Sequence, residues 1–96
     1  MPAKVINAAG TFNLKQGTGR VYSIYCASVG TAFTIQLNDG PDSAGNVQKK
    51  YGALAAGITP ASGTYVLAPE MNPIVFRDGI QAVTQGTPGE YTVDYD

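Results

Sequence analysis

The chain has 96 residues, a net charge of −1 and a hydrophobic fraction of 44 %. This composition excludes a disordered chain, and the near-neutral charge lacks the basic surface that binds nucleic acid. No apolar run approaches the roughly 20 residues of a membrane span. We expect one domain over residues 1–96, with neither nucleic acid nor membrane as a partner.

The N-terminal stretch MPAKVINAAG has no basic region followed by an apolar one, so it predicts no secretory signal. The single cysteine, Cys26, has no partner for an internal disulfide, and we expect it to be a small buried hydrophobe. The protein is therefore expected to be made in the cytoplasm, and to stay there or to leave it inside a larger particle.

The first predicted strands are Ala3–Ala8 and Thr11–Lys15, followed by a turn at Gln16–Gly19. The glycines of this turn resemble a phosphate-binding loop only superficially. A phosphate site would need a helix after them, and the next residues are strand-like. We interpret the segment as a turn.

The stretch Arg20–Gly40 predicts two strands joined at Val29–Thr31. In the second strand large apolar residues alternate with polar ones, which is typical of a strand with one buried face. The first is apolar on both sides, which favours a central position. Its predicted faces are Tyr22, Ile24 and Cys26 on one side and Val21, Tyr25 and Val29 on the other.

The segment Asn38–Asn46 has the strongest loop composition of the chain, because its Asn, Asp, Gly, Pro and Ser residues all favour turns. Asp39 and Asp42 could in principle gather oxygen ligands around calcium. Their spacing fits no standard calcium loop, and no Glu closes the segment. We predict an exposed loop, with calcium as the alternative.

The next segment predicts an edge strand at Val47–Tyr51, whose lysines would oppose aggregation through the edge. Ala53–Ala56 is long enough for one helical turn at most, and Thr59–Gly63 is a predicted turn. Thr64–Pro69 is predicted as a strand with Tyr65 and Leu67 pointing inward. The two prolines within Ala68–Pro73 favour a rigid crossover.

Three further strands are predicted at Ile74–Arg77, Ile80–Thr84 and Glu90–Asp96, with turns at Asp78–Gly79 and Gln85–Gly89. Many short strands separated by closely spaced turns are typical of sandwiches and small barrels. The sequence thus predicts an all-β fold, a single-domain antiparallel β-sandwich or small jelly-roll-like barrel of about eight strands.

Catalytic chemistry has few candidate groups in this chain. The absence of histidine removes the usual nucleophile activation systems, and one cysteine is too few for a zinc site. The seven carboxylates are spread over predicted turns and strand faces, at Asp39, Asp42, Glu70, Asp78, Glu90, Asp94 and Asp96. We predict that the protein is not an enzyme and has neither a metal nor a cofactor.

The six tyrosines permit two interpretations. They could form a platform for sugars or proteins, or pack their rings in the core with the hydroxyl near the surface. The second is the default for any one of them. As a set they also fit a protein interface, where tyrosine is enriched. They are Tyr22, Tyr25, Tyr51, Tyr65, Tyr91 and Tyr95.

The C-terminal third consists of PIVFRDGI (73–80), GTPG (86–89) and the final alternation YTVDY (91–95). It resembles the ends of small virion proteins of tailed bacteriophages, and TPASGTY (59–65) is similar to their loops. This resemblance implies a structural role, as a β-domain that decorates or cements a capsid or sits in a tail or neck. It implies no catalytic or ligand residue.

We therefore expect a non-enzymatic virion protein that binds and bridges subunits of the major capsid protein or other virion subunits. A homo-oligomer such as a trimer is compatible with this role. The alternatives are a carbohydrate- or peptide-binding β-sandwich module and a phage tail or neck component. The interface is expected on the exposed loops and the N-terminal segment, at Asn38, Asp39, Asp42, Asn46, Glu70, Met71 and Asn72.

Overall fold

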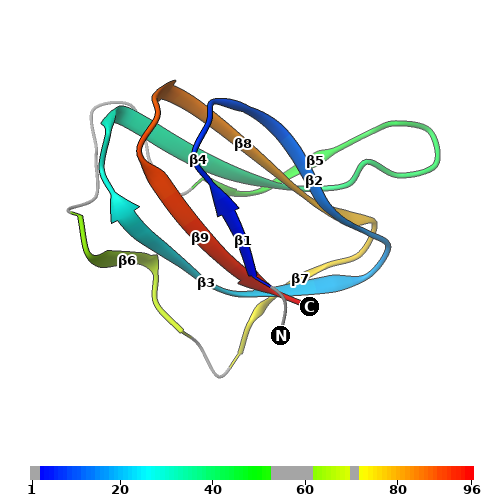
Figure 1. Cartoon of the computed structure of the whole chain (residues 1–96). Coiled ribbons are helices and arrows are strands. Elements are labelled where there is room, and N and C mark those ends of the chain that lie inside the picture. Colours follow the sequence, from blue (N-terminus) through cyan, green and yellow to red (C-terminus); the bar gives the residue numbers. More distant parts are fainter. Residues whose placement is uncertain (1–2, 53–61, 70–71) are drawn as a thin grey trace.

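The computed structural model describes residues 3–52, 62–69 and 72–96, which form nine strands and no helix. Figure 1 shows their arrangement. The strands are β1 (Ala3–Ile6), β2 (Gly10–Gln16), β3 (Gly19–Ser28), β4 (Thr31–Asp39), β5 (Gln48–Gly52), β6 (Thr64–Leu67), β7 (Ile74–Phe76), β8 (Gly79–Thr87) and β9 (Glu90–Tyr95). The one-turn helix considered at Ala53–Ala56 lies outside the described residues.

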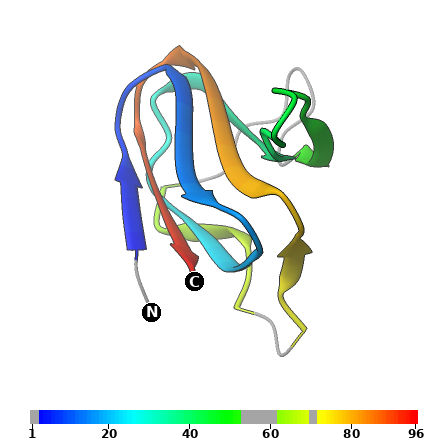
Figure 2. The same ribbon diagram turned by 90° about the vertical axis from the view of Figure 1, so that its right-hand side faces the viewer.

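The strands form two sheets. Sheet A has the order β1-β9-β3-β6, with β7 also paired to β3, and sheet B has the order β2-β8-β4-β5. Every pair is antiparallel. Figure 2 shows the layers from the side, with β1 and β9 on one side and β8 and β5 on the other. The predicted antiparallel β-sandwich is confirmed.

The two strands predicted within Arg20–Gly40 are present, but they do not pair with each other. β3 belongs to sheet A and β4 to sheet B, so the connection at Val29–Gly30 crosses between the layers. The prediction that the first strand is central is confirmed, since β9 lies on one side of β3 and β6 and β7 on the other. The predicted edge strand β5 is also confirmed.

The predicted faces of β3 are partly wrong because the strand contains a bulge. Val21 pairs with Tyr95 and Ser23 with Asp94, which leaves Tyr22 as the extra residue. A bulge shifts the alternation of side chains by one position. Val21, Ile24 and Cys26 are consequently all buried, whereas Tyr22 is only partly buried.

The core lies between the sheets and contains apolar side chains of both. Sheet A contributes Ile6, Val21, Ile24, Cys26, Phe76, Tyr91 and Val93, and sheet B contributes Phe33, Ile35, Leu37, Ile80 and Ala82. The alternation predicted for β4 and β9 is confirmed. Phe33, Ile35 and Leu37 of β4 are buried, as are Tyr91 and Val93 of β9. Tyr95 of β9 is partly buried and packs against the core. Cys26 is buried, as expected.

β8 continues to Thr87, through part of the segment predicted as a turn at Gln85–Gly89. Gly86 has a φ of +104°, and a Cβ there would collide with the backbone of Ala32. The absence of a side chain at Gly86 therefore allows β8 to lie close to β4. At this point β4 is irregular, because its register with β8 shifts between Thr31 and Thr34. The turn predicted at Gln85–Gly89 is confirmed at Pro88–Gly89, between β8 and β9, but its first three residues belong to β8.

Candidate interaction surface

The outer faces of the two sheets differ in chemistry. On sheet B, amide side chains form a hydrogen-bonded chain across three strands. Gln36 donates to Asn38 (2.8 Å), Asn38 to Gln81 (3.0 Å) and Gln81 to Asn13 (3.1 Å). This part of the outer face of sheet B therefore presents amide side chains whose polar groups already bond to one another.

The outer face of sheet A is more apolar. Four large hydrophobic residues among those described are exposed, and three of them lie on this sheet: Val5 (48 % exposed), Tyr65 (51 %) and Val75 (49 %). Val75 points outward because its neighbours Ile74 and Phe76 pack against the core.

Strand pairing places four outward-facing residues of sheet A in one line. Val5 of β1 is opposite Thr92 of β9, Thr92 is opposite Tyr25 of β3, and Tyr25 is opposite Tyr65 of β6. We call these four residues the cross-strand row. None of them is charged, and the row crosses the width of sheet A.

Tyr25 and Tyr65 form the aromatic end of the row. Their ring centroids are 5.1 Å apart and their planes meet at 68°, an edge-to-face contact. This arrangement leaves Tyr65 half exposed. A fixed, amphipathic aromatic pair of this kind is typical of the anchors of protein interfaces.

The prediction that Tyr65 points inward with Leu67 is wrong. Ile24 pairs with Leu67, but the next residue, Tyr25, pairs with Tyr65, so Val66 is an extra residue in β6. This bulge places Tyr65 on the outer face while Leu67 packs against the core. Alternation along the chain could not reveal it, because the extra residue is defined by the neighbouring strand.

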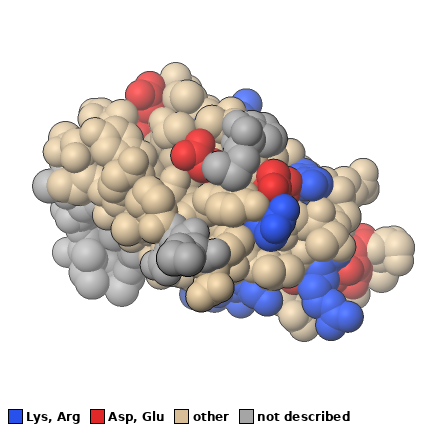
Figure 3. Space-filling model, turned by 90° about the horizontal axis from the view of Figure 1, so that it is seen from below, with Lys and Arg blue, Asp and Glu red and all other residues tan. Residues whose placement is uncertain are grey.

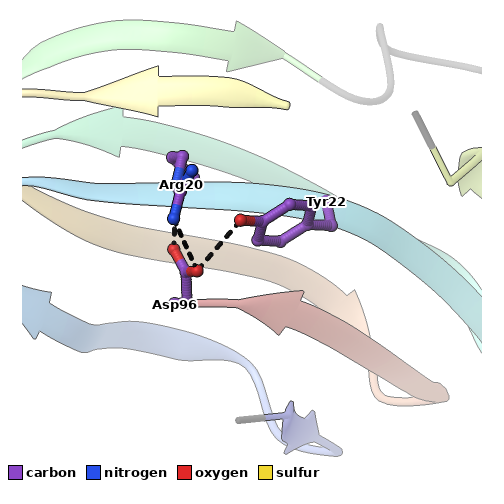
Figure 4. A network of polar contacts seen from close by, with 3 residues as sticks. All are labelled: Arg20, Tyr22 and Asp96. Atoms are coloured by element: carbon purple, nitrogen blue, oxygen red, sulfur yellow. Dashed lines mark hydrogen bonds and ion pairs between the residues drawn. The ribbon is translucent and has the colours of Figure 1, made fainter. Parts of the chain in front are cut away.

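Beside the row, Arg20 and Tyr22 reach from β3 to the carboxylate of Asp96 (Figure 4). Arg20 donates through Nε (3.1 Å) and Nη2 (2.9 Å), and the Tyr22 hydroxyl donates at 2.9 Å. The Arg20 guanidinium also lies 5.6 Å from the Tyr22 ring centroid. Hydrogen bonding to Arg20, then to Tyr22, lowers the pKa of Asp96 below its ordinary value. The side chains of Arg20 and Asp96 form an ion pair, so together they contribute no net charge to the outer face of sheet A.

Two other acidic residues of β9 point to the same side as Thr92, at Glu90 and Asp94. Asp94 accepts a hydrogen bond from the Ser23 hydroxyl (3.1 Å). Within the described residues an ion pair joins Arg20 to Asp96, and none involves Glu90 or Asp94. In Figure 3, which views the molecule from below, the Lys and Arg atoms in view lie toward the middle and right, and none lies on the tan surface at the left end. The face is therefore acidic around an uncharged row.

The sequence-predicted residues Asn38 and Asp39 belong to β4 and are buried, at 6 % and 5 % exposure. The prediction that the exposed loop starts at Asn38 is therefore wrong at its first two positions. Asp39 accepts hydrogen bonds from the backbone N–H groups of Arg77 (3.0 Å) and Asp78 (2.8 Å). Burial opposes its ionised form, but these bonds outweigh it and lower the pKa of Asp39.

Asp42 and Asn46 lie in the loop between β4 and β5. One oxygen of Asp42 accepts the backbone N–H groups of Ala44 and Asn46, each at 2.9 Å, which closes the loop on itself. Asp39 and Asp42 line an open hollow of about 470 Å³. Both oxygens of Asp39 and one oxygen of Asp42 accept backbone N–H groups. The described residues contain no group of three or more acidic, Cys or His side chains that could hold a metal ion. This geometry argues against the calcium alternative.

The remaining predicted interface residues lie in the connection before β7. Asn72 is exposed, and Glu70 and Met71 lie outside the described residues. Figures 1 and 2 both place the described residues on either side of Glu70 and Met71 away from the loop after β4. Among the described residues, the structure therefore does not gather the sequence-predicted positions into one site, and their role as an interface stays a prediction. The sequence patterns did not predict that Val5, Tyr25, Tyr65 and Thr92 share one surface, because this depends on which strands pair.

Comparison with protein-family models, with curated proteins and with solved structures finds no match for this chain. In the described part of the chain there is no helix long and apolar enough to cross a membrane.

Proposed function

We propose that this domain is a non-enzymatic structural protein of a phage particle, which decorates the capsid and bridges its subunits. In this proposal the outer face of sheet A is the binding surface. The resemblance of residues 73–95 to small phage virion proteins supports a place in the phage particle. The chemistry of the outer face of sheet A supports binding to other subunits.

The observation that carries the binding role is the cross-strand row of Val5, Thr92, Tyr25 and Tyr65. Specific protein interfaces bury about 800 Å² on each partner and concentrate their energy in aromatic anchors. The row offers such anchors on the flat side of a rigid sandwich. Repeated copies on a symmetric shell would add avidity to weak single contacts.

Gradient sedimentation tests the setting. Particles from a lysate of the source are separated on a density gradient, and the fractions are probed for this chain. We expect the chain to sediment with intact particles in many copies. Separation of heads from tails then distinguishes a capsid position from the alternative tail or neck position. A chain that stays at the top of the gradient would contradict both.

A second candidate is a carbohydrate-binding module, which the half-exposed Tyr65 and its partly buried neighbour Tyr25 favour. The 68° angle between their rings disfavours an extended glycan, because successive sugars stack best on rings that face the same way. Tyrosine fluorescence titrated with neutral oligosaccharides tests this candidate. Saturable quenching that disappears in Tyr65→Ser would support it over the virion role.

A further inference from the structure

We propose that the outer face of sheet A binds a protein other than this chain. The partner presents an apolar or aromatic side chain flanked by Lys or Arg. This inference names the partner chemistry and rests on the proposed binding role of the outer face. A second copy of this chain, paired face to face, is not the occupant.

The charge distribution on the outer face carries the first half of the argument. The uncharged row is flanked by Glu90 and Asp94, which have no ion-pair partner among the described residues. Arg20 is the basic residue of this face, and Asp96 neutralises it. Lys4 of β1 pairs with the buried Val93 and lies on the opposite side of its strand. The charge on this face that has no ion-pair partner among the described residues is therefore acidic, on the partly buried Glu90 and Asp94. Complementary interfaces match such acids with basic groups.

The same charges disfavour a homodimer through this face. A two-fold interface brings the same patch of both subunits together. Glu90 and Asp94 of each copy would then be buried against the acids of the other, and the described part of either face has no Lys or Arg free to neutralise them. Like charges that are placed together in an interface strongly oppose association. The uncharged row with its acidic flanks thus favours a partner that carries basic groups over a second copy of the same face.

Two capped pentapeptides, Lys-Leu-Tyr-Leu-Lys and Glu-Leu-Tyr-Leu-Glu, test the proposal as matched probes. Each is titrated into the ¹⁵N-labelled chain to millimolar concentration, and amide shifts are followed by NMR. We expect the lysine peptide to bind at least about fivefold more tightly, with shifts centred on β9, β3 and β6. Equal affinities, a preference for the glutamate peptide, shifts confined to sheet B, or no shift with either peptide would each overturn it.

Charge-neutral variants locate the effect. The double variant Glu90→Gln, Asp94→Asn keeps the side-chain shapes and an acceptor for Ser23. We expect it to bind the lysine peptide about three- to tenfold more weakly and to lose the difference between the peptides. The matched control, Asp78→Asn, removes one exposed acid in the turn between β7 and β8, outside the cross-strand row, and should bind like the parent. An unchanged preference in the double variant contradicts the proposal.

These measurements need no phage particle, so the two proposals can fail separately. Sedimentation with particles together with equal peptide affinities would retain the virion role and reject the basic partner. A charge preference in a chain that does not sediment with particles would do the reverse.

Discussion

Tyr91 of sheet A stacks on Phe33 of sheet B, with ring centroids 5.0 Å apart and planes inclined by 22°. Both side chains are fully buried, and the Tyr91 hydroxyl donates a hydrogen bond to the Phe33 carbonyl. Phe33 lies where the pairing of β4 with β8 changes register. The tyrosine therefore fills the core and also satisfies a backbone group at an irregular point of the facing sheet.

Two substitutions at Tyr91 should separate these contributions. Tyr91→Phe keeps the ring but removes the donor to a buried carbonyl, which we expect to cost about 1–3 kcal/mol of unfolding free energy. Tyr91→Ala also leaves a cavity and should cost about 3–5 kcal/mol or prevent folding. Chemical denaturation measures both values. A Tyr91→Phe variant as stable as the parent would show that the hydrogen bond contributes nothing.

Stability at high pH should depend on the same hydroxyl. Burial raises the pKa of Tyr91 from its ordinary 10.0 to about 12. A raised pKa in the folded state stabilises the fold below pH 10, and this contribution is lost between pH 10 and 12. Thermal unfolding between pH 8 and 11 should show a shallower decline in Tyr91→Phe than in the parent, relative to each variant's value at pH 8.

Burial also raises the pKa of Cys26, so this thiol contributes to the alkaline decline with the same sign. The comparison is therefore made in a Cys26→Ala background as well. Parallel curves for the parent and Tyr91→Phe in both backgrounds would contradict the role of Tyr91.

Asp39 should stabilise the connection between β7 and β8 as an anion. Its pKa is lowered from the ordinary 3.8, so its contribution is present above about pH 4 and is lost as the pH falls through the folded-state value. Asp39→Asn should lower the free energy of unfolding by about 1–3 kcal/mol at pH 7. The asparagine NH₂ group would face the backbone N–H groups of Arg77 and Asp78, and two donors cannot bond to each other. The difference from the parent should shrink below pH 4, with exposed Asp78→Asn as the control.

Gly89 is expected to tolerate no side chain. A Cβ at this position would fall on the carbonyl oxygen of Ser28, in the paired strand. Gly89→Ala should force the backbone of the β8–β9 turn to move and cost about 1–3 kcal/mol. Gly52→Ala is the matched control, since its nearest neighbour is the flexible end of Lys49 at 3.5 Å. Equal thermal stability of the two variants would refute the steric explanation.

Tyr65→Ser should separate binding from folding. Its side chain is half exposed and contacts Tyr25 edge to face, so its loss should cost less than about 1.5 kcal/mol of stability. Particle binding in the gradient should fall at least tenfold, as for an aromatic anchor. Gln85→Ser, on the exposed outer side of sheet B, should leave binding unchanged. Similar losses in both variants would place the interface elsewhere.

Local patterns in the sequence determined most of the strands and the all-β class. The alternation of Phe33, Ile35 and Leu37 fixes which side of β4 is buried, because successive side chains of a strand point to opposite faces. The run of apolar residues in β3 likewise predicts its central position. Composition alone also shows that the chain has no histidine and a net charge of −1.

Tertiary structure decided the faces that local patterns misassigned. The bulges at Tyr22 and Val66 exist only relative to the paired strands, and each moves a tyrosine to the outer side of sheet A. The row of Val5, Tyr25 and Tyr65 joins residues that are far apart in the chain. Its register depends on which strands pair, a non-local property that no stretch of sequence contains by itself.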